Sequence, residues 1–365
     1  MTLRHEIEQE IRERGPMPFS RYMELCLYHP ELGYYSRNVE QFGKAGDFYT
    51  SSDVHAVFGR LLARQFEEMW WVLGSPQQIE ILELGPGRGL FAQDVLDWSE
   101  KKFPEFFRAI HYTLAERSQA LRGRLQTTLD RHFKSGKASF PRHPNSRFAD
   151  NSLGGEETAP FNAAPATLGQ TGKGTTSVVP TGTSMDRALA PEVPAIVFAN
   201  EFFDALPVEV VTEQGELRLA EKDGTFIESC YPASVEELEF LDRYSVRPEG
   251  GERIEANLIA QRYMSDIASV AHRGFVVAVD YGYTQQEQLA GRHRGTVTAY
   301  RQHSISATPY EAPGEQDITA HVNFTALAVA VEQAGMQVQP LLTQSQFLLG
   351  IGEQNQLSVR TADCR

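Results

Sequence analysis

One stretch of the chain, residues 79–90 (IEILELGPGRGL), limits what the sequence can fold into more than any other. The apolar run from Ile79 to Leu84 predicts a buried strand, and apolar residues from Leu90 onward recur at helical spacing. Between them lie three glycines at alternate positions, Gly85, Gly87 and Gly89. A strand that ends in glycines and continues as a helix is typical of the nucleotide-binding turn of a doubly wound α/β domain.

The spacing of these glycines indicates which ligand the turn would hold. A dinucleotide fold has the pattern G-x-G-x-x-G, whose third glycine would fall at position 90, where this chain has Leu90. The pattern here is instead E-x-G-x-G-x-G, from Glu83 to Gly89. It resembles the first motif of Rossmann-like S-adenosylmethionine methyltransferases, in which the strand-end acidic residue lies close to the methionine end of the cofactor. A glycine-rich turn without a ligand is the alternative.

The composition restricts partners and compartment. With 34 Lys and Arg against 48 Asp and Glu, the formal net charge is −14, which disfavours nucleic acid and favours a basic protein segment as partner. The three cysteines form no CxxC pair and no histidines have a metal-ligand spacing, so we expect neither a metal site nor a disulfide framework. We see no apolar run near the ~18 residues of a membrane span and no targeting peptide. A bacterial cytoplasmic protein is the expectation.

The predicted elements divide the chain into four parts. Residues 1–75 form a helical, aromatic-rich extension, either a lid over a cofactor or an ordinary packed segment. Residues 76–206 begin a Rossmann-like core, with strands at 79–84, 110–116, 146–150 and 195–199 and a flexible insertion at 151–194. Residues 207–254 predict an inserted antiparallel β-layer. Residues 255–365 complete the core, with strands at 274–279, 338–342 and 347–351. The expected fold class is α/β, with a mostly parallel, seven-stranded sheet.

Two further strand ends carry polar residues where α/β proteins collect their chemistry. Glu116 ends the second strand, and a carboxylate there can accept hydrogen bonds from both ribose hydroxyls of an adenosine group; alternatively it only caps the helix that begins near Ser118. Asn200, Glu201 and Asp204 follow the fourth strand, beside the expected cofactor. They are the candidate catalytic residues, unless they merely cap a strand-to-helix turn.

Seven segments together resemble one known family, the MidA-like S-adenosylmethionine-dependent methyltransferases. In chain order they are FSRYMELCLYHPELGYYS, GDFYTSSDVHAVFG, ELGPGRG, VFANEFFDALPVE, VDYG, RGT and DITAHVNF, and they span most of the chain. Mitochondrial members of this family assist assembly of respiratory complex I and are regarded as protein arginine methyltransferases. The resemblance implies a Rossmann-like fold, S-adenosylmethionine as cofactor, and cofactor contacts at Glu83, Gly85, Gly87, Gly89 and Glu116. It also adds Asp47 and Thr50 to the candidate cofactor-binding residues.

An arginine acceptor would need help from the protein, because a guanidinium group is protonated at any working pH and is a poor nucleophile. A carboxylate can hold its two nitrogens and polarise charge onto one of them. We assign this role first to Glu201 and second to Asp204, with Asn200 orienting the pair. Glu201 and Glu209 also roughly match the spacing of the paired glutamates in dedicated arginine methyltransferases.

Other functions stay open on the sequence alone. The acceptor can be a small molecule or a nucleic-acid base, although base amino-methyltransferases carry prolines in the segment where this chain has NEFF at 200–203. The chain can also be a scaffold that binds S-adenosylmethionine and assembles a partner with little turnover, and a NAD-dependent enzyme is disfavoured by Leu90. We expect a protein substrate, with a respiratory-complex subunit as one candidate, and a monomer or homodimer.

Overall fold

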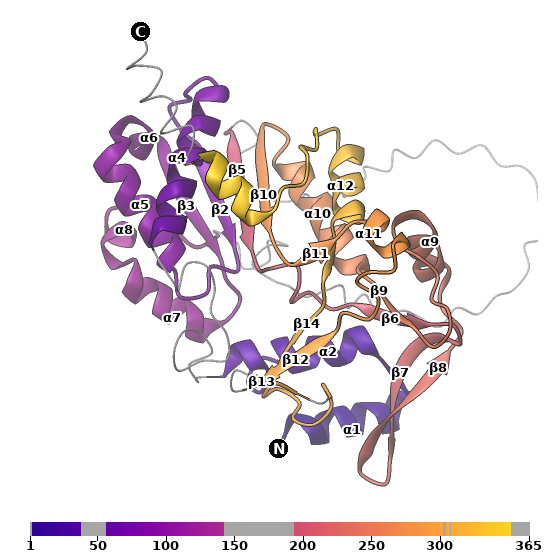
Figure 1. The fold of residues 1–365 in the computed structure, drawn as a ribbon. Helices are drawn as coiled ribbons and strands as arrows, with labels where there is room; N and C mark the ends of the chain where they lie inside the picture. The colour runs from indigo at the N-terminus through magenta and orange to yellow at the C-terminus, as the bar shows by residue number, and fades with distance from the viewer. Residues whose placement is uncertain (1, 38–55, 142–192, 302–303, 307, 352–365) are drawn as a thin grey trace, which may run out of the picture.

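The structure is a computed structural model that describes residues 2–37, 56–141, 193–301, 304–306 and 308–351. Figure 1 shows a parallel sheet between two layers of helices, with an N-terminal extension and an antiparallel β-layer beside it. The candidate residues Asp47 and Thr50, the predicted strand at 146–150 and nearly all of the predicted insertion at 151–194 lie outside the described residues.

The parallel sheet carries the strands predicted around the glycine turn. Its order is β10-β5-β2-β3-β4, and every pairing is parallel. The strands are β2 (Ile79–Leu84), β3 (Ile110–Ala115), β4 (Ala138–Ser139), β5 (Ala195–Asn200) and β10 (Gly274–Val279). The chain proceeds from β2 to β3 on one side and returns to β5 on the other. The carboxyl ends of β2 and β5 therefore lie side by side at the switch in strand order, the position at which open α/β sheets bind their ligands.

Alternating apolar side chains explain why helices cover both faces of this sheet. Ile81 and Phe198 join one core cluster with α4 (Val57–Val72) and α5 (Leu90–Lys102). Leu82 and Val197, their neighbours along the strands, join another cluster with α10 (Leu258–Val270) and α12 (Phe324–Gln333). Successive strand residues point to opposite faces, so a continuous apolar run predicts a sheet buried on both sides.

Within the described ranges, no helix is both long and apolar enough to cross a membrane.

The N-terminal extension and the inserted hairpins share a second sheet. The antiparallel strands β6 (Glu209–Thr212), β7 (Gly215–Lys222), β8 (Thr225–Tyr231) and β9 (Arg253–Ala256) form the layer, and β1 (Met17–Pro18) pairs with β7. The helices α1 (Leu3–Arg14) and α2 (Phe19–Tyr28) bury their apolar faces in one cluster with β6, β7 and β8. The antiparallel β-layer predicted from the hairpin signals is therefore present, and it extends to β9 and β1.

Shorter elements connect and flank these two sheets. They are η1 (Tyr34–Ser36), α6 (Pro104–Ala109), α7 (Gln119–Thr128), α8 (Asp130–Lys134), α9 (Val235–Tyr244), β11 (Gly282–Tyr283), α11 (Gln285–Leu289), β12 (Thr298–Arg301), β13 (Ser304–Ile305), β14 (Asp317–Thr319) and β15 (Val322–Asn323).

The two final strands predicted for the sheet are wrong. Residues 338–342 have no regular secondary structure, and residues 344–351 form a helix. Thr343 begins this helix, because its hydroxyl accepts from the N–H of Gln346 at 3.2 Å while Oε1 of Gln346 accepts from the N–H of Thr343 at 2.9 Å. This capping box is a helix-start signal that the apolar run 347–351 obscured. Among the described residues, the parallel sheet has five strands rather than seven.

Candidate functional site

The glycine turn after β2 adopts a conformation that glycine takes far more easily than other residues. The φ angles of Gly85, Gly87 and Gly89 are +60°, +53° and +80°, in the left-handed region. A Cβ at Gly85 would lie 3.1 Å from Cδ2 of Phe202, and a Cβ at Gly89 would lie 2.7 Å from Cδ2 of Leu125. The turn therefore lies directly between the chain that follows β5 and helix α7.

Glu83 lies near the end of β2, just before this turn. Its side chain is buried, and the Tyr112 hydroxyl from β3 donates to its Oε2 at 2.8 Å. Burial raises the pKa of Glu83 to about 8, although the Tyr112 hydrogen bond acts in the opposite direction. The carboxyl group is thus mostly protonated at pH 7. A positively charged ligand group beside it would favour its ionised form.

Glu116 lies directly beyond β3, next to the glycine turn, because the N–H of Gly85 donates to the carbonyl of Ala115 at 3.1 Å. Burial raises the pKa of Glu116 to about 7. The N–H of Ser118 donates to Oε1 of Glu116 at 2.7 Å, and this hydrogen bond acts to lower the pKa. The hydroxyl of Ser118 caps α7 by accepting from the N–H of Leu121. The capping position of this helix therefore belongs to Ser118, and Glu116 lies at the carboxyl edge of the sheet.

The segment after β5, residues 200–206, is called the acceptor loop below. Glu201 has φ +48°, an unusual value for a residue with a side chain. The ring of Phe202 lies over Gly85 and contacts the ring of Tyr263 from α10, with a centroid distance of 5.2 Å. Oδ1 of Asn200 is buried without a hydrogen-bond partner in the part of the chain that the structure describes. Backbone strain and an unsatisfied buried acceptor together are typical of a functional loop.

Four carboxyl groups gather at the acceptor loop, and they are called the acidic group: Glu201, Asp204, Asp280 and Asp317. Burial raises the pKa of Asp204 well above its ordinary value, and the charges of Asp280, Asp317 and Glu201 raise it further, in that order. Burial raises the pKa of Asp280 to about 7, opposed by backbone N–H groups of the acceptor loop. The group can therefore hold a cation or accept a proton near neutral pH.

Two tyrosines of the N-terminal extension reach this site. The hydroxyl of Tyr28, at the end of α2, donates to the carbonyl of Ala205 at 2.9 Å. The hydroxyl of Tyr35, in η1, donates to Oδ1 of Asp317 at 2.9 Å. The described part of the extension therefore contacts one side of the site.

Asp280 and Asp317 belong to the site although they were not among the predicted site residues. Asp280 directly follows β10, so the strand-end criterion that selected Glu83 and Glu116 also applies to it. Asp317 begins the short strand β14 and approaches Asp204 only through the tertiary fold. Nothing in its local sequence indicates that contact.

The structure brings most of the predicted site residues to one edge of the sheet. Glu83 lies near the end of β2 and the turn follows it, Glu116 follows β3, and Asn200 ends β5 with Glu201 and Asp204 directly after it. Their assignment to cofactor and acceptor stays a prediction. Glu209 does not join Glu201: it belongs to a separate group, because β6 carries it into the antiparallel layer.

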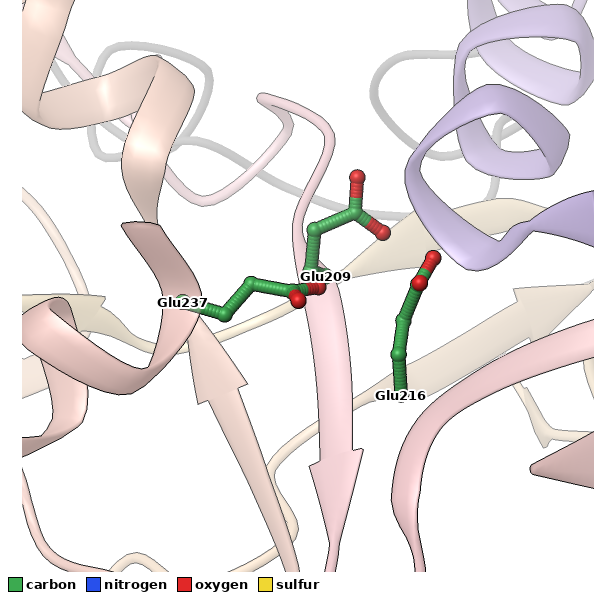
Figure 2. A group of neighbouring side chains, drawn as sticks. All are labelled: Glu209, Glu216 and Glu237. Atoms are coloured by element: carbon green, nitrogen blue, oxygen red, sulfur yellow. The ribbon is translucent and has the colours of Figure 1, made fainter. Parts of the chain in front are cut away.

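Figure 2 shows that separate group, formed by Glu209 of β6, Glu216 of β7 and Glu237 of α9. One carboxylate oxygen from each lies within 4.8 Å of the others, beside a cavity of about 270 Å³. Each carboxylate has its own partner: the hydroxyl of Ser20 donates to Glu209, Arg218 pairs with Glu216 at 2.8 Å, and the N–H of Ser234 donates to Glu237. Of these three contacts, the one from Ser20 to Glu209 joins the start of α2 to β6, whereas the other two lie within β7 and at the start of α9.

The fold and the site define a class I methyltransferase architecture. In it, a glycine turn follows one strand of a parallel sheet, and acidic residues lie at the carboxyl ends of that strand and of its neighbours. Comparison with known proteins gives the family: residues 61–342 match the model of the family described as "Putative S-adenosyl-L-methionine-dependent methyltransferase". The chain belongs to this family, and its cofactor is S-adenosylmethionine.

Curated relatives and solved structures agree with this family. The chain is 29% identical to the mitochondrial protein arginine methyltransferase NDUFAF7 homolog of Drosophila melanogaster over 350 residues, which cover 92% of this chain and 71% of the relative. It is 28% identical to human mitochondrial protein arginine methyltransferase NDUFAF7, covering 98% and 74% of the two chains. A Burkholderia thailandensis protein crystallised with S-adenosyl-homocysteine superposes with a TM-score of 0.75 at 26% identity, covering 98% of this chain and 82% of that one.

Proposed function

We propose that this protein transfers the methyl group of S-adenosylmethionine to an arginine side chain of a partner protein. The observation that carries the proposal is the acidic group beside the glycine turn. In it, burial and the charges of Asp280, Asp317 and Glu201 raise the pKa of Asp204. A guanidinium group carries the positive charge that carboxylates of such a group can bind. Relatives of this chain are named protein arginine methyltransferases.

Residues on β2 and β3 would hold the cofactor. We assign Gly85, Gly87 and Gly89 to close backbone approach, Glu83 to the methionine end and Glu116 to the ribose hydroxyls. Asp47 and Thr50 stay assigned to the cofactor through the family resemblance. The bound cofactor supplies an electrophilic methyl group on a sulfonium.

The acceptor loop would bind and orient the guanidinium. Glu201 holds two of its nitrogens, so that the third faces the methyl group, and Asn200 offers its buried Oδ1 as a hydrogen-bond acceptor. A guanidinium loses one proton for each methyl group it gains. Burial and acidic neighbours raise the pKa of Asp204, which makes its ionised form a stronger base, and we assign it to accept that proton.

The four parts of the chain then have distinct roles in the proposal. Residues 76–206 and 255–365 form the cofactor-binding core, residues 207–254 support the acceptor side, and residues 1–75 cover the site. We propose a protein of the bacterial cytoplasm, active as a monomer or homodimer. Following the family resemblance, the acceptor we propose first is a subunit of a respiratory complex.

The test begins with calorimetric titration of S-adenosylmethionine into the purified protein and into Gly87→Val. Valine tolerates the left-handed φ of Gly87 poorly, so we expect the variant to lose the micromolar binding of the wild type. Methyl-labelled cofactor is then supplied with bacterial protein extract, and labelled proteins are analysed for methylarginine by mass spectrometry.

Label on arginine supports the proposal. Label on small molecules alone would show a different acceptor class. Cofactor binding without any transfer would favour the scaffold function.

A further inference from the structure

We propose that Asp280 is the positioning residue of the acceptor loop: its carboxylate fixes the backbone that carries Glu201 and Asp204. This inference rests on the proposed function, in which those two side chains bind the acceptor. Asp280 directly follows β10, the strand next to β5 in the sheet.

The hydrogen bonds of Asp280 show how one side chain can determine this loop. Its Oδ2 accepts from three consecutive backbone N–H groups, those of Phe202 at 3.2 Å, Phe203 at 2.9 Å and Asp204 at 3.4 Å. Its Oδ1 accepts from the N–H of Tyr281 at 2.8 Å. Consecutive N–H groups that converge on one point form a concave site for an anion, and here a side chain of the protein itself occupies it.

The backbone strain at Glu201 makes this anchor necessary. A left-handed φ is unfavourable for a residue with a Cβ, and it persists only where the surroundings fix it. The N–H of Glu201 donates to the carbonyl of Val279 at 2.8 Å, and the next three N–H groups donate to Asp280. Val279, the last residue of β10, and Asp280, which follows it, therefore hold the backbone at Glu201 and directly after it. The direction of its side chain follows from β10 rather than from the preference of its own segment.

A carboxylate is the suitable side chain at position 280 for two reasons. Asparagine offers one acceptor oxygen, and its amide nitrogen would face N–H groups as a donor. Hydrogen bonds to an ionised acceptor are also roughly twice as strong as those between neutral groups. The charge of Asp280 is moreover the largest electrostatic contribution to the raised pKa of Asp204, so its removal would change the proton-accepting group as well as the backbone.

Other contacts hold the later part of the loop and supply a matched control. The hydroxyl of Tyr28 donates to the carbonyl of Ala205 at 2.9 Å, and the N–H of Ala320 donates to the carbonyl of Asp204 at 2.9 Å. Tyr28→Phe removes one hydrogen bond from the same loop without affecting the N–H groups of residues 202–204. It therefore separates general loosening of the loop from loss of the Asp280 anchor.

The experiment compares wild type, Asp280→Asn, Asp280→Glu and Tyr28→Phe as full-length proteins. Amide hydrogen exchange measures the protection of residues 202–204, with the amides of β5 as the internal reference. We expect Asp280→Asn to lower that protection by about ten- to hundredfold. Asp280→Glu keeps a carboxylate in a displaced position, so it should lower the protection of residues 202–204 less. It also provides a second test of the anchor if Asp280→Asn fails to fold. Tyr28→Phe should leave it unchanged.

Two further measurements separate positioning from other roles. In Asp280→Asn, the calorimetric affinity for S-adenosylmethionine should stay within about threefold of wild type. The kcat for transfer to the acceptor should fall, while KM for the cofactor stays unchanged. Unchanged protection at 202–204, or cofactor affinity lost together with protection, would overturn the positioning role. Hydrogen exchange at residues 202–204 does not depend on the acceptor. If Asp280→Asn lowers the protection there but the wild-type protein methylates no arginine, the proposed acceptor is refuted and the positioning role of Asp280 stands.

Discussion

The buried carboxyl group of Glu83 makes a quantitative prediction about stability. An acid whose pKa is raised by folding keeps its proton over a pH range in which the unfolded chain loses it. Its contribution to stability is therefore present at low pH and is lost as pH rises from the unfolded pKa through the folded one. For Glu83 the window runs from 4.5 to about 8. Glu83→Gln replaces the titrating group with a neutral one of similar shape, which still accepts from Tyr112.

The magnitude follows from the size of that pKa rise. Each pKa unit corresponds to about 1.4 kcal/mol once Glu83 is ionised in both the folded and the unfolded chain. Between pH 5 and pH 7 the unfolded chain has largely lost this proton while the folded protein keeps it, and the free energy of unfolding therefore falls by about 2–3 kcal/mol. Glu116, Asp280 and Glu209 also have raised pKa values and contribute losses of the same sign. They are present in both proteins, so the difference between wild type and Glu83→Gln isolates Glu83.

Urea unfolding at pH 5, 6, 7 and 8 measures this difference. We expect the free energy of unfolding of Glu83→Gln to rise relative to wild type by about 2–3 kcal/mol from pH 5 to pH 7. Glu105→Gln is the control, because Glu105 is an exposed side chain on α6 and should give a constant difference. A constant difference for Glu83→Gln as well would refute the reasoning, since it would mean that Glu83 is already ionised in the folded protein.

Three further variants test the turn and the two candidate sites. Gly89→Ala should cost about 1–3 kcal/mol of stability in urea unfolding, because it combines a left-handed φ with a Cβ 2.7 Å from Leu125; an unchanged midpoint would contradict this. Glu201→Gln should abolish methyl transfer while calorimetric affinity for S-adenosylmethionine stays near normal; lost affinity would place Glu201 in the cofactor site instead. Glu116→Gln should weaken that affinity by about tenfold or more, since an amide cannot accept from both ribose hydroxyls as a carboxylate does; unaltered binding would remove Glu116 from the site.

Local sequence patterns determined the centre of the fold. The apolar run of β2 must be buried on both faces, and glycines that tolerate a left-handed φ must follow it, so residues 79–90 specify a strand, a turn and a helix without help from distant parts of the chain. The same criterion located β3 and β5 and therefore the edge where Glu83, Glu116 and Asn200 lie. Hairpin signals likewise predicted the antiparallel layer.

Patterns failed where two signals competed within a few residues. The apolar run at 347–351 suits a strand as well as a helix, and the capping box of Thr343 and Gln346 decides for the helix. The spacing of Glu201 and Glu209 also roughly matched the paired glutamates of dedicated arginine methyltransferases, although the chain enters a different sheet after Pro207. Spacing along the chain does not give distance in space once the chain changes sheets.

Only the tertiary structure decided which side chains meet at the acceptor loop. Asp280 and Asp317 are 76 and 113 positions from Asp204 in the chain, yet both perturb its ionisation. Tyr28 reaches the loop and Tyr35 reaches Asp317 because the N-terminal extension shares a sheet with the inserted hairpins. The physical reason is that strand, turn and helix preferences act over a few residues, whereas burial, hydrogen bonds and charge act between groups that the packing of distant segments brings together.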